Sequence, residues 1–334
     1  MDIKETIFKL CELDGASGDE ASVCGYAEKL LRKYTDNVVN KNGGVTAYIG
    51  RHDGSRPVVV LDAHIDQIGF IVTSVENGFA KAACLGGIDT RLLSAQRVTV
   101  HGRSDIHGVI VSIPPHLKGE SAKVPDKSEI YIDISGRDSE VSAGDSVTFE
   151  VSPCELSDNV ITAGALDDRC GMAAVLYALE KLDINALEYD IAAVFSSQEE
   201  IGERGAAMCA YDVNADIVIA VDVSFAYSEG ENKTKCGELG KGCMIGISPS
   251  LDRELSRKLI SIAEKENIPY QKEIMSGTTG TNADKYTVAQ GGAAGATLSI
   301  PIRYMHTPAE VCDLNDVVST GKLIAEFLKE AGKH

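Results

Sequence analysis

Hydrophobic residues at the start of the chain recur at the spacing of helix turns. Ile3, Ile7 and Leu10 would share one face of a helix, because positions three or four apart are neighbours on its surface. Ser17 and Glu20 have the capping-box spacing that often begins a helix, and a periodic apolar segment follows them. The pattern therefore predicts two helices before the first strand.

Two short apolar runs that follow are typical of β-strands. Residues 45–49 are rich in β-branched and aromatic side chains, and residues 58–63 are apolar almost without a break. A strand that lacks alternation is usually buried on both faces. We therefore expect the second run to be a central strand of a sheet, ending at His64.

The character of the sequence changes between residues 69 and 160. Short β-branched runs are interrupted there by Gly, Pro, Asp and Ser, and helical periodicity is weak. This pattern predicts a small all-β domain of residues 69–160. It would be inserted into a larger domain formed by residues 1–68 and 161–334.

Strands and helices alternate in the second part of the larger domain. The predicted helices are 170–182, 203–210, 252–266, 283–289 and 313–331, and the predicted strands are 190–196, 216–221, 243–247 and 295–300. Such alternation is typical of helices covering both faces of a parallel or mixed sheet. The predicted fold class is therefore α/β, with a mixed central sheet and an inserted β domain.

Charge and cysteine content narrow the classes of partner. The 334 residues carry 32 Lys and Arg against 50 Asp and Glu, and a net charge of −18 repels nucleic acid and anionic membranes. The nine cysteines are scattered without a C-x-x-C pair, so we expect reduced thiols and no thiolate zinc site. No signal-peptide pattern and no membrane-spanning stretch are visible. We expect a cytoplasmic protein without nucleic-acid or membrane partners.

Acidic and imidazole side chains gather at the ends of predicted strands and at the start of one predicted helix. They are His64, Asp66, Asp167, Asp168, Glu199, Glu200, Asp222 and His306. In α/β sheets, ligands bind beyond the carboxyl ends of the strands, so we expect these side chains to lie close together. Imidazoles and carboxylates are ligands of zinc, cobalt and manganese. The pattern therefore indicates a metal site.

Two pairs have a spacing that suits such a site. His64 and Asp66 lie on the same side of an extended chain, so Asp66 can hold the imidazole nitrogen that does not face the metal. Glu199 and Glu200 are adjacent and point in different directions. One of them can therefore bind a metal while the other remains free as a base.

The pair Asp167-Asp168 could provide a carboxylate that bridges two cations about 3.5–4 Å apart, between which water becomes a usable nucleophile. Each element also has a structural interpretation. The paired acids could interact with helix N-termini, and His306 could be an ordinary loop histidine. The residues alone leave these interpretations open, together with the choice between Asp167 and Asp168.

Considered together, the residues lie in segments that resemble the M42 family of metallopeptidases, the glutamyl and tetrahedral aminopeptidase group. The segments are AHIDQIGFIV, KSEIYIDISG, AGDSVTF, GALDDRCG, FSSQEEIGERGA, IAVDVS, LGKG, GTNAD and RYMHTPAEV. The resemblance extends over essentially the whole chain. It departs at residues 223–231, which lack an expected D-x-P loop, and at Asn282, where the family commonly has Asp. These departures concern substrate preference more than chemistry.

The resemblance implies two divalent metal ions per subunit, zinc or cobalt, with manganese as a further option. The implied ligands are His64 and Asp222 for one ion and Glu200 and His306 for the other, with Asp167 bridging. Glu199 would be the general base, and Asp66 would orient His64. This set assigns a role to every place singled out above.

The resemblance also implies an activity and an assembly. The protein would be a metal-dependent aminopeptidase that releases N-terminal residues from short peptides by means of a metal-activated water. In the family, the inserted domain is PDZ-like and builds tetrahedral dodecamers from dimers, with active sites facing an inner cavity. We therefore expect residues 69–160 to mediate self-association and to limit access to short peptides.

Other functions fit parts of the pattern. A deacylase or a carboxypeptidase could use the same metals on another amide, and a catalytically silent, shell-forming protein could retain the ligands. Glu199 argues against the silent protein, because metal storage needs no free base beside the ligands. A glycoside hydrolase fits this ligand set less well, and a serine hydrolase would need a G-x-S-x-G motif that the chain lacks.

Overall fold

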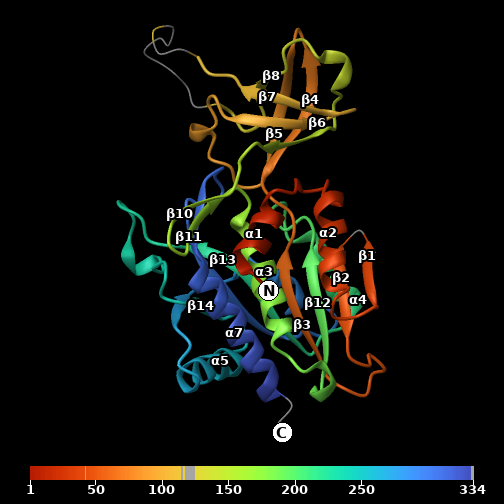
Figure 1. The fold of residues 1–334 in the computed structure, drawn as a ribbon, viewed down its shortest axis with the longest axis vertical. Helices are drawn as coiled ribbons and strands as arrows, with labels where there is room; N and C mark the ends of the chain where they lie inside the picture. Colours follow the sequence, from red (N-terminus) through yellow and green to blue (C-terminus); the bar gives the residue numbers. More distant parts are fainter. Residues whose placement is uncertain (42, 114–115, 117–124, 332–334) are drawn as a thin grey trace.

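The computed structural model describes residues 1–41, 43–113, 116 and 125–331. It has two bodies, a large layered α/β domain and a small β-barrel at the top of Figure 1. The chain enters the barrel soon after β3 (Val58–His64) and is back in the large domain before α3 (Leu166–Glu180). An α/β fold with a mixed sheet and a separate small β domain is therefore confirmed.

The large domain is built on an 11-stranded sheet. Along its hydrogen-bonded path the strands are β1 (Val38–Lys41), β2 (Gly44–Ile49), β12 (Asp190–Ser196), β3, β13 (Ile217–Phe225), β16 (Ala294–Arg303), β17 (Glu310–Asp313), β11 (Val160–Ala163) and β10 (Cys154–Ser157). β14 (Cys243–Ile247) pairs with β16, and β15 (Tyr270–Ile274) pairs with β14. β3 lies parallel between β12 and β13, in the central position that its apolar run predicts.

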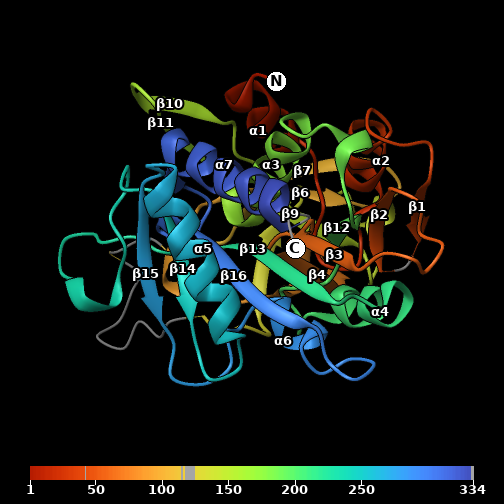
Figure 2. The ribbon, with the colours of Figure 1, turned by 90° about the horizontal axis from the view of Figure 1, so that it is seen from below.

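Helices cover both faces of this sheet, which Figure 2 shows from below. One face carries α1 (Ile3–Cys11), α2 (Ala21–Leu31), α3, α5 (Arg253–Lys265) and α7 (Leu314–Ala331), and the other carries α4 (Arg204–Val213) and the short α6 (Ala283–Tyr286). The faces follow from strand alternation. In β3, Val59 and Leu61 pack with α3 and α7, whereas Val60 packs with α4 and α6.

The barrel closes from antiparallel strands around a core of its own. Its order is β4 (Gly69–Glu76), β5 (Phe79–Leu85), β8 (Ile130–Asp133), β7 (Asp105–Ile110), β6 (Arg97–His101) and β9 (Ser146–Phe149), which pairs back to β4. Its inward residues, such as Val98 and Val100 on β6, are buried and apolar. The barrel strands thus lie between residues 69 and 149, and β10 already pairs in the large sheet.

Local expectations differ from the structure at Ser17 and at the ends of two strands, and the strands β15 and β17 were not predicted. Ser17 does not cap α2, because its hydroxyl donates to the carboxylate of Asp66 at 2.6 Å, and Glu20 occupies the N-cap position. β13 and β16 extend beyond the predicted strands to Phe225 and Arg303. Polar residues near their ends remain paired in the sheet, so the change to polar side chains did not mark the end of either strand.

The cysteines and helices add two simple findings. All nine cysteines are free thiols, and five of them are buried. Within the described parts of the chain, none of the helices has both the length and the apolar character that a membrane span requires.

Candidate metal centre

The side chains singled out in the sequence converge at one end of the large sheet. His64 is the last residue of β3, Asp222 lies on β13, and Glu199 and Glu200 follow β12. Because these strands are parallel, their carboxyl ends meet at one edge of the sheet. Asp167 reaches the same place from the start of α3.

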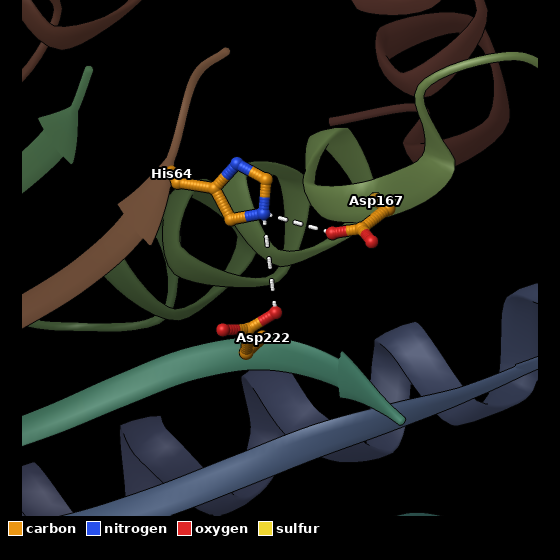
Figure 3. A group of neighbouring side chains, drawn as sticks. All are labelled: His64, Asp167 and Asp222. Atoms are coloured by element: carbon orange, nitrogen blue, oxygen red, sulfur yellow. Dashed lines mark hydrogen bonds and ion pairs between the residues drawn. The ribbon is translucent and has the colours of Figure 1, made fainter. Parts of the chain in front are cut away.

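His64, Asp167 and Asp222 point toward one another in Figure 3. The Nε2 atom of His64 lies 2.8 Å from Asp167 Oδ1 and 4.0 Å from Asp222 Oδ1. All three side chains are buried, and their facing atoms lie within 4.8 Å of one another. One cation can be held between atoms at this spacing.

A second group forms on the other side of Asp167. His306 lies in the turn between β16 and β17, with its Nε2 atom 3.2 Å from Asp167 Oδ2 and 3.4 Å from Glu200 Oε1. These facing atoms also lie within 4.8 Å of one another. Each oxygen of Asp167 therefore faces one histidine, which is the arrangement of a carboxylate shared by two cations.

The neighbouring acid, Asp168, has different surroundings. It belongs to neither group among the described residues, and its Oδ1 accepts the N–H of Gly171 at 3.0 Å near the start of α3. Burial raises its pKa well above the ordinary value, and its Oδ2 has no hydrogen-bond partner in the described structure. A buried carboxyl that is held at the start of α3 suits a structural role. The geometry therefore favours Asp167 as the shared carboxylate.

Asp66 connects the first group to the two glutamates. The Nδ1 atom of His64 lies 3.1 Å from the backbone oxygen of Asp66 and 3.5 Å from its Oδ1. The Asp66 carboxylate accepts the backbone N–H groups of Glu199 and Glu200 at 2.9 and 3.2 Å, in addition to the Ser17 hydroxyl. Asp66 thus contacts the imidazole through its carbonyl and holds the turn that carries both glutamates.

Glu199 differs from its neighbour Glu200 because its carboxylate has no hydrogen-bond or ion-pair partner among the described residues. It belongs to neither metal-binding group, and no residue in the described parts of the chain donates a hydrogen bond to its side chain. Burial raises the pKa of Glu199 to about 8. A half-buried carboxylate that lines the pocket and accepts no hydrogen bond in the described structure has the properties of a base for water.

Glu310 is part of this centre, although the sequence analysis did not single it out. It is 1% exposed and begins β17. Its Oε2 accepts the N–H of Asp167 at 3.1 Å, and its Oε1 accepts the N–H of His306 at 2.9 Å. One carboxylate therefore fixes the backbone of both residues. The only signal in the sequence was its position four residues after His306.

The barrel also reaches the centre. Gly86 and Gly87 follow β5, and the carbonyl oxygen of Gly87 lies 3.3 Å from His306 Nδ1. A Cβ on Gly87 would approach that nitrogen to 2.5 Å, so a larger residue cannot fit without moving the ring. When Nδ1 carries the proton for this contact, Nε2 remains free to bind a metal.

The carboxylates of the centre carry more negative charge than its two histidines can balance. Burial raises the pKa of Glu200 and of Asp222 to about 8. Burial opposes protonation of His306, but its hydrogen bond to Asp167 raises its pKa to about 9. Burial likewise acts against ionisation of Asp167, yet the hydrogen bonds from both histidines hold its pKa well below the ordinary value. Two divalent cations would balance these carboxylates, so the donor set fits zinc, cobalt or manganese.

A pocket of about 310 Å³ opens onto both groups. Asp167, Glu199, Asp222 and His306 line it, together with residues 223–225. The segment that departs from the family pattern therefore contributes to the pocket. The other departure, Asn282, is buried outside it and donates to Asp62 at 2.8 Å and to Ser196 at 2.8 Å.

Comparison with known proteins agrees with this geometry. The model of the family described as M42 glutamyl aminopeptidase matches residues 43–323. The chain belongs to the M42 peptidase family. As a member of that family it is a metal-dependent aminopeptidase, an enzyme that hydrolyses peptide bonds.

Relatives of this M42 chain match it over nearly its whole length. A lysyl aminopeptidase of Pyrococcus furiosus is 32% identical, over 98% of this chain and 96% of the relative. The structure of aminopeptidase APDkam598 from Desulfurococcus kamchatkensis matches with a TM-score of 0.90 and 33% identity, covering 98% of this chain and 94% of that one. The Pyrococcus horikoshii TET1 peptidase, which can assemble into a tetrahedron or a large octahedral shell, matches with a TM-score of 0.82 and 30% identity, covering 98% and 99%.

Proposed function

We propose that this M42 enzyme removes N-terminal residues from short peptides at a centre of two divalent ions, zinc or cobalt, with manganese as a further option. The observation that supports this best is Asp167, which stands between two separate groups of ligand atoms. In this assignment His64 and Asp222 hold one ion, Glu200 and His306 hold the other, and Asp167 bridges them.

The residues around the ions divide the remaining tasks. The ions would act as Lewis acids toward the peptide carbonyl and lower the pKa of water. Glu199 takes a proton from the attacking water and returns it to the leaving amine, because its carboxylate lines the pocket and is not needed as a ligand. Asp66 holds His64 and the Glu199 backbone in place, and Glu310 holds Asp167.

The charge of the pocket favours attack from the N-terminus. The carboxylate of Glu199 lines the wall beside the two groups and attracts an α-ammonium group. No lysine or arginine lines the described pocket to attract the C-terminal carboxylate of a peptide. This supports an aminopeptidase over a carboxypeptidase that would use the same ions.

A peptide assay with a blocked control tests this proposal. The enzyme, loaded with zinc, cobalt or manganese, is incubated with a tetrapeptide and with its N-acetyl form, and mass spectrometry follows the products. We expect stepwise loss from the N-terminus of the free peptide and almost no cleavage of the acetylated one. Removal of C-terminal residues, or equal cleavage of both peptides, would instead support the carboxypeptidase or deacylase.

We further propose that the inserted domain, residues 69–160, is a PDZ-like module that builds a tetrahedral dodecamer from dimers and limits access to short peptides. The shells of the P. horikoshii relative support this proposal. Apolar side chains on the outside of the barrel also support it. They are Ile71, Phe79, Val109 and Tyr131, each 37–47% exposed. Residues 1–68 and 161–334 would then form the catalytic unit.

Light scattering of the native protein tests the assembly separately from the chemistry. A mass near twelve subunits is expected, and a variant in which a short linker replaces the barrel should give a much smaller particle. A native monomer at micromolar concentration would end the shell proposal and would leave the peptidase proposal standing.

A further inference from the structure

Glu273 lines the same pocket as the metal-binding groups but belongs to neither of them. It lies on β15, and its carboxylate accepts a hydrogen bond from Ser299 Oγ at 2.7 Å and another from Ser224 Oγ. Ser224 follows Asp222 by two residues on β13, so both side chains point to the same face of the sheet. The two serines therefore hold the Glu273 carboxylate on the face that carries the metal centre.

This carboxylate can accept further hydrogen bonds. Its two oxygens offer about four lone-pair sites, and the serine hydroxyls use one on each oxygen. The side chain is half-buried, and no cation in the described parts of the chain forms an ion pair with it. A half-buried carboxylate in a pocket whose described lining has no lysine or arginine is stabilised best by a cation from a ligand.

The distance from the metal centre suits a long basic side chain. Of the two serines that hold Glu273, Ser299 is the cross-strand partner of Asp222, about 5 Å away, and Ser224 lies about 7 Å along the strand from Asp222. The extended four-carbon stem of lysine spans roughly 6 Å. The lining also includes Phe225, Met275 and Met305, whose side chains can pack against a hydrocarbon stem.

We propose that Glu273 selects peptides whose N-terminal residue is lysine or arginine, by pairing with the ammonium or guanidinium group. The inference rests on the proposed aminopeptidase function, because that function places the N-terminal side chain in this pocket. A glutamate at the N-terminus of a peptide would bring a second carboxylate to Glu273 without a cation between them. The pocket therefore disfavours the glutamyl preference in the description of the family.

Two measurements test this selection. The first compares kcat/KM of the metal-loaded enzyme for anilides of lysine, arginine, norleucine and glutamate. Norleucine has the same four-carbon stem as lysine and lacks only the terminal ammonium group, so the ratio of lysine to norleucine isolates the charge. The second measurement determines the Kd of free L-lysine and free L-norleucine by calorimetry, which does not depend on turnover.

The variant Glu273→Gln retains the shape of the side chain and removes its charge. We expect the lysine-to-norleucine ratio to fall by about 10- to 100-fold, both in kcat/KM and in binding, as for a lost hydrogen bond between charged groups. Glu238→Gln makes the same change of charge at an exposed glutamate outside the pocket and should leave both ratios unchanged. If Glu273 had a purely structural role, the substitution would lower kcat/KM for the lysine and norleucine anilides by the same factor and leave their ratio unchanged.

The possible failures can be told apart. If the wild-type enzyme releases norleucine or glutamate as fast as lysine, or if Glu273→Gln retains the wild-type ratio, the selection by Glu273 is wrong. If no anilide is hydrolysed with any of the three ions, the proposed function fails. The calorimetric ratio then still decides whether Glu273 recognises a basic side chain.

Discussion

The candidate metal centre has two halves, the group around His64 and the group around His306, and they are built differently. The His64 side chain is 1% exposed and ends a central strand of the large sheet, whereas the His306 side chain is 31% exposed and lies in a turn. Among the described residues, the hydrogen bonds and ion pairs of His64 all come from the large domain. Those of His306 include Gly87 of the barrel.

One half of the candidate centre therefore belongs to the sheet, and the other lies at a junction between two domains. Asp167 belongs to both, with one oxygen on each side. We therefore expect the half around His64 to form whenever the sheet is intact. The half around His306 should depend in addition on the barrel loop and on Glu310.

The largest expected effect concerns Glu199, which belongs to neither group of ligand atoms and is the proposed base. Glu199→Gln should lower kcat by about 10²- to 10⁴-fold, because it removes the base that accepts the proton of water. Metal analysis of the same preparation should still find two ions. Glu200→Gln is the matched control, since it makes the same change at the adjacent acid and should lower the metal content by one ion per subunit. Near wild-type turnover in Glu199→Gln would refute its role.

Substitution of each histidine in turn should affect the two halves of the centre differently. His306→Ala should retain one tightly bound ion after dialysis, because the group around His64 is intact, while His64→Ala should lose the buried ion. Both variants should lose most activity. Because His64 is buried, its variant should also show the larger drop in Tm. Full occupancy of both sites in His306→Ala would show that its ligand is another residue.

A change in the barrel should affect only the half at the junction. Gly87→Ala places a methyl group against the His306 ring. It should lower the affinity for one of the two ions by about 10- to 100-fold, the usual effect of disturbing a residue that orients a metal ligand. Titration of metal-free protein with zinc measures both affinities. Gly25→Ala is the control, since a Cβ there meets no atom within 4 Å. Two unchanged affinities in Gly87→Ala would argue against a role for the barrel loop.

The smallest expected effect is on the pH dependence of stability. In the metal-free protein the pKa of Glu200 and of Asp222 is about 8, and that of His306 is about 9. Groups with a raised pKa bind protons more tightly when folded, so their stabilisation is present at low pH and lost as the pH rises through 8 to 9. With a chelator present, the Tm should therefore fall by a few degrees from pH 6 to pH 9.

Added divalent ions should remove most of this dependence, because they replace the protons as partners of the carboxylates. Scanning calorimetry at both pH values, with and without zinc, provides the comparison. A metal-free protein that became more stable at pH 9 would contradict the assigned electrostatics of the centre.

The site residues that could be predicted best from the sequence are those at the ends of the sheet strands. Residues directly after apolar strands, such as His64 and Asp222, could be found because strand ends of a parallel sheet meet in space. Glu310 and Gly87 could not, since each acts on a residue that is distant in sequence or through its backbone. Ser17 shows the same limit. Its spacing to Glu20 is local, but its hydroxyl bonds to Asp66 across 49 positions.

The position of β3 has a consequence for synthesis on the ribosome. Its two neighbours in the sheet, β12 and β13, emerge more than a hundred residues after it, whereas the whole barrel lies between. The barrel can therefore fold on the nascent chain while residues 58–63 still lack their neighbouring strands in the sheet. The proposed set of metal ligands is complete only after His306, the last of them along the chain, has left the exit tunnel. Until β12 and β13 emerge, the apolar β3 segment needs protection from aggregation.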